Sequence, residues 1–203
     1  LPPLNYLFIN FFIFSLFFLF LTKKSNQHKN FKLFFLYGWL FGFGYFGTNL
    51  YWISISLTFD QNFKFLIPLT VILIPAFLAL FYGLITFSFI IFKPKKTVSS
   101  FLTFSIVFGF FEFLRGSILT GFPWNLIAYS FSNHLEFLSI TSIIGVYGFN
   151  LFCVSLFTCP AILILKYTKK DLSIFILLII TVIFTYVYGY SYKENFDVKK
   201  KEN

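Results

Sequence analysis

The 203-residue chain is 58% hydrophobic and only 11% charged, and its mean hydropathy is +0.83. Soluble domains carry about 25% charged residues, so this composition excludes a water-soluble globule and indicates a polytopic membrane protein. The net charge of +9 arises from lysines placed between apolar runs, which is typical of membrane topology and not of nucleic-acid binding. The sequence contains neither zinc-ligand spacing nor a phosphate-binding glycine loop, so we expect no metal and no cofactor.

Six apolar runs are long enough to cross a bilayer, which takes about 20 residues, and in lipid each run must be helical to satisfy its backbone. We therefore predict an all-α fold, a polytopic transmembrane helix bundle of about six spans. The spans in chain order are 4–22, 33–57, 65–92, 98–119, 135–165 and 172–190. They form a helix bundle over 1–192, followed by an outer-side linker at 193–203. Pro68, Pro75 and Pro160 lie inside these runs, so kinks are expected there.

Lysine clusters lie in the loops after the first, third and fifth spans, at 23–32, 93–96 and 166–170. The two loops between them hold one lysine, at 58–64, and none, at 120–134. By the positive-inside rule the lysine-rich loops are cytoplasmic, so both ends of the chain are expected outside. The chain begins with leucine and contains no methionine, so we expect a piece of a longer protein in which another span comes first.

Small residues in two of the spans are spaced for close helix packing. The second span contains GWLFGFGYFG, with small residues at Gly38, Gly42, Gly44 and Gly47. The fifth span has a small residue at every third position, at Ser139, Ser142, Gly145 and Gly148. Such stripes let two helix backbones approach closely, so we interpret both as helix–helix contacts.

The fourth span ends in FEFLRGSILTGFPW, which places Glu112 and Arg115 in the outer half of the membrane. Three residues apart on a helix, the two side chains share a face and can pair. An unpaired charge at that depth costs about 2.5–3.5 kcal/mol, so both are expected to face protein or a wet cavity. Three interpretations stay open: a structural ion pair, a contact with a lipid headgroup or substrate, and a pair that snorkels to the interface.

Further polar and aromatic residues are expected in or near the outer half, at Asn49, Tyr51, Trp52, Trp124, Tyr129 and Asn150. Singly, Trp and Tyr are typical of an interface belt, but together with the charged pair they outline a chamber that opens outward. The turn after the fourth span either anchors in the headgroup layer or lines the mouth of this chamber, because Gly121 frees the backbone and Pro123 stops the helix. The predicted substrate-binding residues are Glu112, Arg115, Gly121, Phe122, Pro123, Trp124, Tyr129, Asn49 and Trp52.

The two cysteines, Cys153 and Cys159, stand six residues apart in one apolar run. On a helix they point about 240° apart and are poorly placed to pair. We interpret both as buried, inert thiols and assign no catalytic residue and no metal ligand to this chain.

Three segments, GWLFGFGYFGTNLYWISISL, EFLRGSILTGFPWNLIAYS and IIGVYGFN, resemble the membrane part of apolipoprotein N-acyltransferases. The resemblance runs in order through almost the whole chain. Its most specific block comprises Glu112, Leu114, Arg115, Gly116 and 120–124. Where the family usually has Gly-Tyr-Ser-Gln, this chain has Ala-Tyr-Ser-Phe at 128–131, so one local contact is expected to differ.

The resemblance implies transfer of an acyl chain from a membrane phospholipid to the α-amino group of a lipoprotein's diacylglyceryl-cysteine, in the bacterial cytoplasmic (inner) membrane. It implies ping-pong chemistry through a cysteine thioester, carried by a Glu-Lys-Cys triad in a nitrilase-like domain on the outer side. That domain is expected after the sixth span, where this chain stops. Cys153 and Cys159 match no triad position, so we expect the chain to bind and orient lipid without catalysing.

Two other functions are compatible with an apolar helix bundle. A small transporter or channel would be favoured by broken helices around a polar site at the midplane, whereas the polar residues here lie toward the outer side and no inverted repeat is visible. A membrane scaffold without a ligand is the other alternative. A nitrilase-like domain encoded downstream would exclude the transporter.

Overall fold

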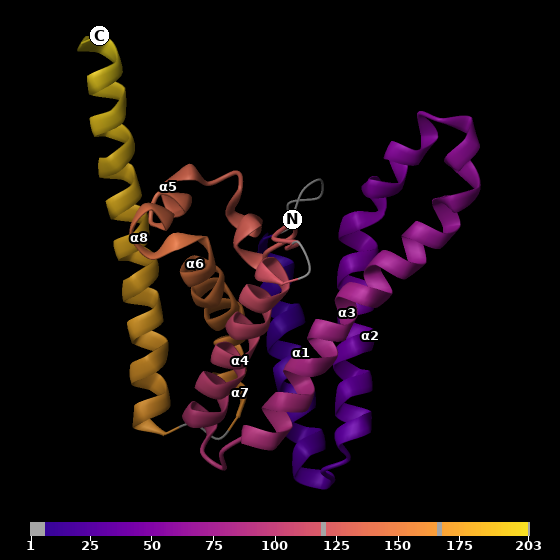
Figure 1. The fold of residues 1–203 in the computed structure, drawn as a ribbon. Helices are drawn as coiled ribbons and strands as arrows, with labels where there is room; N and C mark the ends of the chain where they lie inside the picture. The colour runs from indigo at the N-terminus through magenta and orange to yellow at the C-terminus, as the bar shows by residue number, and fades with distance from the viewer. Residues whose placement is uncertain (1–6, 119–120, 166–167, 203) are drawn as a thin grey trace. The chain divides into compact units, whose positions relative to one another are not determined.

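The computed structural model describes residues 7–118, 121–165 and 168–202, with the backbone alone at 170–171 and 194–202. The described residues form helices and no strand. The α-helices are α1 (Leu7–Gln27), α2 (Phe31–Leu50), α3 (Ile67–Phe92), α4 (Thr97–Ser117), α5 (Leu135–Leu138), α6 (Thr141–Thr158), α7 (Pro160–Ile164) and α8 (Lys169–Glu202) (Figure 1). The 3-10 helices are η1 (Tyr51–Thr58), η2 (Gln61–Leu66) and η3 (Ile127–Phe131).

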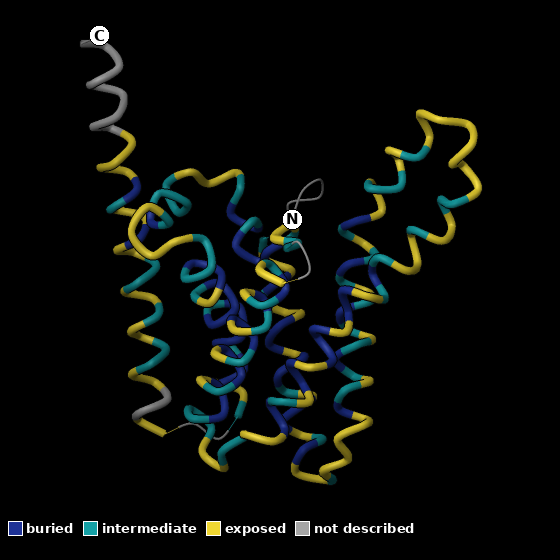
Figure 2. The backbone as a smooth tube through the Cα atoms, in the orientation of Figure 1, coloured by how far each residue is buried: buried dark blue, intermediate teal, exposed yellow. Residues whose placement is uncertain are grey.

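Among the described residues, five segments are long and apolar enough to cross a membrane. They are Leu7–Gln27, Gln61–Phe92, Thr97–Ser117, Thr141–Ile164 and Leu172–Lys193. The helix α2 stands where another span was predicted, but it is not among these five segments. Large apolar side chains are exposed on every one of these helices. Figure 2 colours exposed residues yellow along the backbone. The predicted all-α membrane helix bundle is confirmed.

Several predicted boundaries differ from the helices. The helix α2 ends at Leu50, and the rest of the second predicted span lies in η1. The helical backbone of α8 continues through the first ten residues predicted as a linker, to Glu202. Pro68 lies in the first turn of α3. Amide groups in the first turn of a helix have no partner within the helix, so a proline there breaks no hydrogen bond and no kink is expected. The predicted positions 4–6 and 119 lie outside the described residues.

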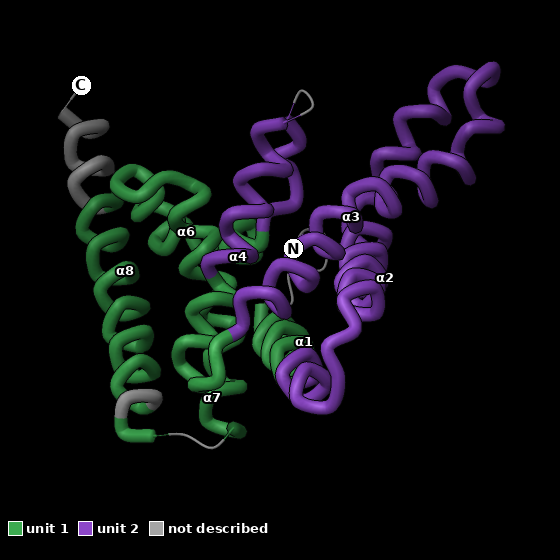
Figure 3. Tube along the Cα trace, turned by 60° about the horizontal axis from the view of Figure 1, so that its bottom comes forward, with its two compact units in different colours: residues 1–19, 94–105, 127–203 green, residues 20–93, 106–126 purple. Residues whose placement is uncertain are grey.

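The described residues divide into two compact units (Figure 3). Unit 1 takes its residues from 1–19, 94–105 and 127–203, and unit 2 from 20–93 and 106–126. The helices α1 and α4 each contribute one part to unit 1 and the other to unit 2.

The contact between α2 and α3 builds the interior of unit 2. A side chain at Gly38 would collide with the Thr86 hydroxyl and the Tyr82 carbonyl oxygen, and a Cβ at Gly42 would lie 2.7 Å from Tyr82 Cβ. The Thr86 hydroxyl donates to the Phe34 carbonyl oxygen at 2.6 Å, which is possible only at this close approach. The predicted contact through the Gly38–Gly42 spacing is confirmed.

The other two glycines of this stripe do not pack against a helix. A Cβ at Gly44 or Gly47 would meet no described atom within 4 Å. Both glycines lower the helix propensity of α2 without a contact that requires them. Only the first half of the predicted stripe is therefore a helix–helix interface.

Unit 1 is held by hydrogen bonds between polar side chains and the backbone or other side chains, and by contacts between phenylalanine rings. The Asn10 amide of α1 donates to the Ser130 hydroxyl of η3 at 3.0 Å, and the Asn150 side chain of α6 accepts from the Ala128 amide at 3.0 Å. These bonds fix η3 to α1 and α6. The Phe157 ring of α6 lies 4.9 Å from the Phe11 ring, measured between centroids.

The fifth predicted span is broken into α5, α6 and α7. Pro160 begins α7, so the break expected at this proline is present. A second break, which was not predicted, lies inside α6 at Gly145, whose φ of 71° and ψ of 167° are open to glycine. A Cβ at Gly145 would meet no described atom within 4 Å, so interpreting this residue as a packing glycine was wrong. Gly145 instead allows the backbone to bend within α6.

A close glycine contact of unit 1, not predicted from the sequence, lies at Gly189 of α8. A side chain there would collide with the carbonyl oxygen of Glu136 in α5. Four residues farther along α8, the Lys193 ammonium lies 3.1 Å from Glu136 Oε1. One turn of α8 is thus held against α5 by backbone proximity and by an ion pair.

Candidate functional site

The centre of the candidate site is a buried ion pair on α4 in unit 2. Arg115 Nη2 lies 2.8 Å from Glu112 Oε2, and each residue is only 1% exposed. The spacing of three residues puts both side chains on one helix face, as the sequence predicts. Such burial does not fit a pair that snorkels toward water.

The guanidinium of Arg115 also binds the turn that follows its own helix. Its Nη1 donates to the carbonyl oxygen of Phe122 at 2.7 Å and to that of Trp124 at 3.0 Å. The planar guanidinium carries several donors in a fixed fork, so it serves Glu112 on one side and the turn on the other. The ring of Phe46 from α2 covers the group, with its centroid 5.2 Å from Arg115 Cζ.

The backbone of the turn depends on two residues in the left-handed region. Gly121 has a φ of 74°, and a Cβ there would lie 2.6 Å from the carbonyl oxygen of Gly116. Asn125 has a φ of 62°, a conformation that asparagine tolerates better than most residues. The Tyr45 hydroxyl of α2 donates to the Asn125 carbonyl oxygen at 3.0 Å, which fixes the far end of the turn to α2.

The side chains of the turn line an apolar groove of about 560 Å³. Its walls are Trp52, Ile53, Ile55, Ser56 and Phe59 from η1 and its end, and Phe122 and Trp124 from the turn. The rings of Trp52 and Trp124 meet with centroids 5.9 Å apart. We call this the η1 groove. The same two residues of the turn thus give their carbonyl oxygens to Arg115 and their side chains to the groove.

Four buried polar atoms around the ion pair have no hydrogen-bond partner among the described residues. They are Glu112 Oε1, Arg115 Nε, the hydroxyl of Tyr82 and Asn125 Nδ2. The Tyr82 ring stacks on Tyr45 at 5.6 Å and meets the edge of Phe108 at 5.0 Å. Buried polar atoms without a protein partner are commonly satisfied by water or by a polar part of a ligand.

Six of the nine predicted binding residues therefore meet in unit 2 around the ion pair, the turn and the groove. They are Glu112, Arg115, Gly121, Phe122, Trp124 and Trp52. Pro123 lies in the same turn, with an exposed ring. Asn49 is turned to its own helix, where its amide donates to the Tyr45 carbonyl oxygen at 2.7 Å.

Tyr129 and Asn150 lie in unit 1, so they are not part of the site described in unit 2. Thr120, which belongs to the quoted motif, lies outside the described residues. Cys153 and Cys159 are buried free thiols of unit 1. The described residues contain no group of three or more His, Cys, Asp or Glu side chains placed to hold a metal ion.

The ion pair is surrounded by Tyr45, Phe46, Tyr82 and Asn125, none of which was predicted as a site residue from the sequence. The aromatic residues carry no local signal, because 25% of the chain is Phe, Trp or Tyr. One clue was available for Tyr45, since it stands three residues after Gly42 and so shares the helix face that packs closely. Asn125 comes directly after the Gly-Phe-Pro-Trp turn and has a positive φ. Asparagine is favoured at such positions because it tolerates the left-handed region.

This chain is similar in sequence to proteins of a known family. Positions 1–159 match the family model described as the apolipoprotein N-acyltransferase N-terminal domain. The apolipoprotein N-acyltransferase of Rhodopseudomonas palustris is 39% identical over 129 residues, which cover 63% of this chain and 24% of that protein. That of Allorhizobium ampelinum is 32% identical over 169 residues, covering 80% of this chain and 32% of its own length.

The apolipoprotein N-acyltransferase of Rickettsia prowazekii is 35% identical over 181 residues, which cover 87% of this chain and 36% of that protein. The chain therefore spans about a quarter to a third of the length of the curated relatives it matches.

Proposed function

The chain belongs to the apolipoprotein N-acyltransferase family, and from this premise we propose that it forms the membrane part of an enzyme that acylates lipoproteins. The reaction is transfer of a fatty acyl chain from a phospholipid to the N-terminal diacylglyceryl-cysteine of a lipoprotein. The five apolar segments fit a multi-pass protein, which we assign to the bacterial cytoplasmic membrane. The partners of the whole protein are then a membrane phospholipid and a diacylglyceryl-modified lipoprotein.

The role of this chain is to bind and orient lipid at the η1 groove, without catalysing. One observation carries this proposal: Arg115 binds the carbonyl oxygens of Phe122 and Trp124, while the side chains of these two residues line an apolar groove. A wall fixed in this way is formed before the ligand arrives. Binding then loses little entropy in ordering the protein.

In this proposal the chain contributes to acyl transfer by holding the phospholipid donor in a fixed place. A lipid diffuses freely in the plane of the membrane, and its ester carbonyl must meet the nucleophile in one orientation. Positioning of this kind lowers the barrier because translational and rotational freedom has been lost before the chemical step. In this proposal the nucleophile and its base belong to a nitrilase-like domain of the complete protein.

The ion pair has two roles in this proposal. As a structural pair it fixes the end of α4, and through the turn it shapes the lipid site. The unpartnered Glu112 Oε1 and Tyr82 hydroxyl leave polar capacity next to the pair for water or for part of a headgroup.

Kinetics of the complete protein test the proposal. Trp124→Ala removes a groove side chain, whereas its carbonyl oxygen still accepts from Arg115. Acyl transfer from a fluorescent phospholipid to a diacylglyceryl peptide should then show a KM for phospholipid raised several-fold, with kcat little changed. Phe110→Ala is the matched control, because Phe110 is an exposed residue of α4 that does not line the groove. Equal kinetic constants in Trp124→Ala, Phe110→Ala and the parent protein would reject the groove as the lipid site.

A further inference from the structure

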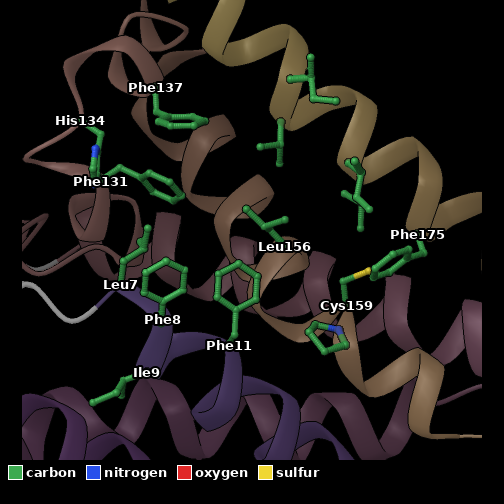
Figure 4. A pocket seen from close by; sticks show the side chains of 15 residues that line it. Leu7, Phe8, Ile9, Phe11, Phe131, His134, Phe137, Leu156, Cys159 and Phe175 are labelled. Atoms are coloured by element: carbon green, nitrogen blue, oxygen red, sulfur yellow. The ribbon is translucent and has the colours of Figure 1, made fainter.

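Unit 1 contains a second apolar cavity, of about 700 Å³, which shares no residue with the η1 groove (Figure 4). Its volume lies in the range of about 300–1,000 Å³ that is usual for sites that bind small molecules. Side chains from α1, α6, α7 and α8 line it, together with Phe131, His134 and Phe137 from the segment between α4 and α6. We call it the α8 pocket.

One face of α8 forms a wall of this pocket. The lining residues of α8 are Phe175, Leu178, Ile179, Val182 and Ile183. Their spacing of three and four residues puts them in one stripe, which extends over about 12 Å of helix axis. In a soluble helix such a stripe would be buried against a neighbour, whereas here Ile179 and Ile183 are 43% and 57% exposed.

The opposite wall comes from the start of α1, with Phe8 and Phe11 among its residues. In Figure 4 these rings face the pocket, with Leu156 of α6 between them and α8. Apart from His134 at one end, the labelled lining side chains are apolar, with Cys159 the only sulfur among them. An apolar cavity of this kind does not hold water.

The surroundings of the pocket decide its occupant. Its three helical walls belong to Leu7–Gln27, Thr141–Ile164 and Leu172–Lys193, which are all apolar enough to cross a membrane. At that depth the solvent is hydrocarbon, so the molecules that reach the opening are lipid acyl chains.

The polarity of the two ends fits an amphiphile. In Figure 4, His134 and Phe137 lie at one end, and Cys159 and Phe175 lie at the other. Two residues after His134, Glu136 forms its ion pair with Lys193. The end at His134 is therefore polar, and the other end is apolar.

We propose that the α8 pocket binds one fatty acyl chain of a membrane phospholipid, whose headgroup lies at the His134 end. The lipid fills the hollow between α1 and α8 and completes the packing of unit 1. The site is independent of the proposed lipid-donor site, because the two have no residue in common.

Photolabelling of the complete protein tests this site. The protein is placed in vesicles of phosphatidylethanolamine and phosphatidylglycerol that contain a phosphatidylethanolamine with a diazirine midway along one acyl chain. Labelled peptides are then mapped by mass spectrometry. We expect label on the first two turns of α1 and on the Phe175–Ile183 face of α8.

Two adjacent isoleucines provide a matched pair of variants. Ile179 lines the pocket, and Ile180, which is 56% exposed, does not. Ile179→Trp fills the pocket and should lower labelling of α1, on the opposite wall, several-fold. Ile180→Trp should leave it unchanged. If Ile179→Trp does not accumulate, Val182→Phe fills the same space with a smaller change in volume and should give the same loss.

Two outcomes would overturn the proposal. One is equal labelling of α1 in the pocket-filling variants, Ile180→Trp and the parent protein. The other is a disulfide between two copies carrying Ile179→Cys, which would identify the pocket as a contact between copies. Activity is measured in the same variants, so a change in labelling with normal acyl transfer separates this site from the η1 groove.

Discussion

Arg115 and Phe122 are hydrogen-bonded to each other in both directions. The Phe122 amide donates to the Arg115 carbonyl oxygen at 3.1 Å, and Arg115 Nη1 donates to the Phe122 carbonyl oxygen at 2.7 Å. The backbone bond closes the end of α4, and the side-chain bond ties the same residue to the buried ion pair. The position of the groove wall therefore depends on one arginine.

A double-mutant cycle tests the coupling of the ion pair. Glu112→Gln and Arg115→Gln each leave one buried charge uncompensated, which costs about 3–5 kcal/mol, so each should lower the yield and melting temperature of the purified protein. The double change leaves no charge, so its cost should be smaller than the sum of the two. Lys193→Gln is the control, because the Lys193–Glu136 pair is partly exposed and an ion pair screened by solvent contributes little to stability. Additive losses would mean that the two side chains act independently.

Gly121 should resist substitution. Gly121→Ala puts a Cβ 2.6 Å from the Gly116 carbonyl oxygen at a φ of 74°, and the left-handed conformation alone costs roughly 1–2 kcal/mol. We expect a lower melting temperature and a raised KM for phospholipid, because the groove wall shifts with the turn. Gly44→Ala, which adds a methyl group in open space on a helix, should be neutral or stabilising. Similar melting curves for the two variants would contradict the described turn.

The two ends of the glycine stripe in α2 should respond differently. Gly38→Ala forces α2 away from Thr86 and Tyr82 and breaks the bond from Thr86 to Phe34, so it should destabilise the protein clearly. Gly47→Ala should have little effect, since a Cβ there meets no described atom within 4 Å. The melting temperature of each variant is measured by heating samples and using size-exclusion chromatography to determine how much folded protein remains. Equal loss in Gly38→Ala and Gly47→Ala would argue against the α2–α3 contact.

The orientation predicted from the lysines can be measured by cysteine labelling. Gln27, the last residue of α1, and Asn133, before α5, are exposed and lie in segments predicted to be on opposite sides of the membrane. With Cys153 and Cys159 replaced by alanine, a membrane-impermeant thiol reagent should label Asn133→Cys in intact cells. Gln27→Cys should react only after the cells are opened. The reverse pattern would invert the topology.

The chain alone should form no acyl-enzyme. When the 203-residue chain is purified and incubated with phospholipid, hydroxylamine should release no acyl group from it. The reason is that the proposed nucleophile belongs to another domain. The complete protein is the positive control. An acyl group on Cys153 or Cys159 would overturn this division of roles.

The hydrophobic pattern predicted the helices well, because each apolar run must form a helix in lipid. The Glu112–Arg115 pair was also predictable, since three-residue spacing and the cost of a buried charge both act locally. The break at Gly145 was not, because a glycine that packs and a glycine that bends look alike in a sequence. The contact of Gly189 with Glu136 joins residues 53 positions apart in the chain, and no local pattern encodes it.

The partners of the ion pair were hidden for a related reason. Tyr45, Phe46 and Tyr82 are three aromatic residues in a chain where one residue in four is aromatic. Their roles follow from the packing of α2 on α3, which sets the register between two segments. The sequence indicates that such a contact exists through Gly38 and Gly42, but not which rings it brings to Arg115.

The 3-10 form of η1 gives the η1 groove a straight wall. Three residues complete each turn of such a helix, so side chains three apart stand in columns parallel to its axis. Trp52 and Ile55 form one column, and Ile53, Ser56 and Phe59 continue the other. If the segment rewound as an α-helix, which turns about 100° per residue instead of about 120°, Phe59 would rotate by about 120° relative to Ile53. The alignment of these side chains along the η1 groove therefore depends on the 3-10 winding of η1.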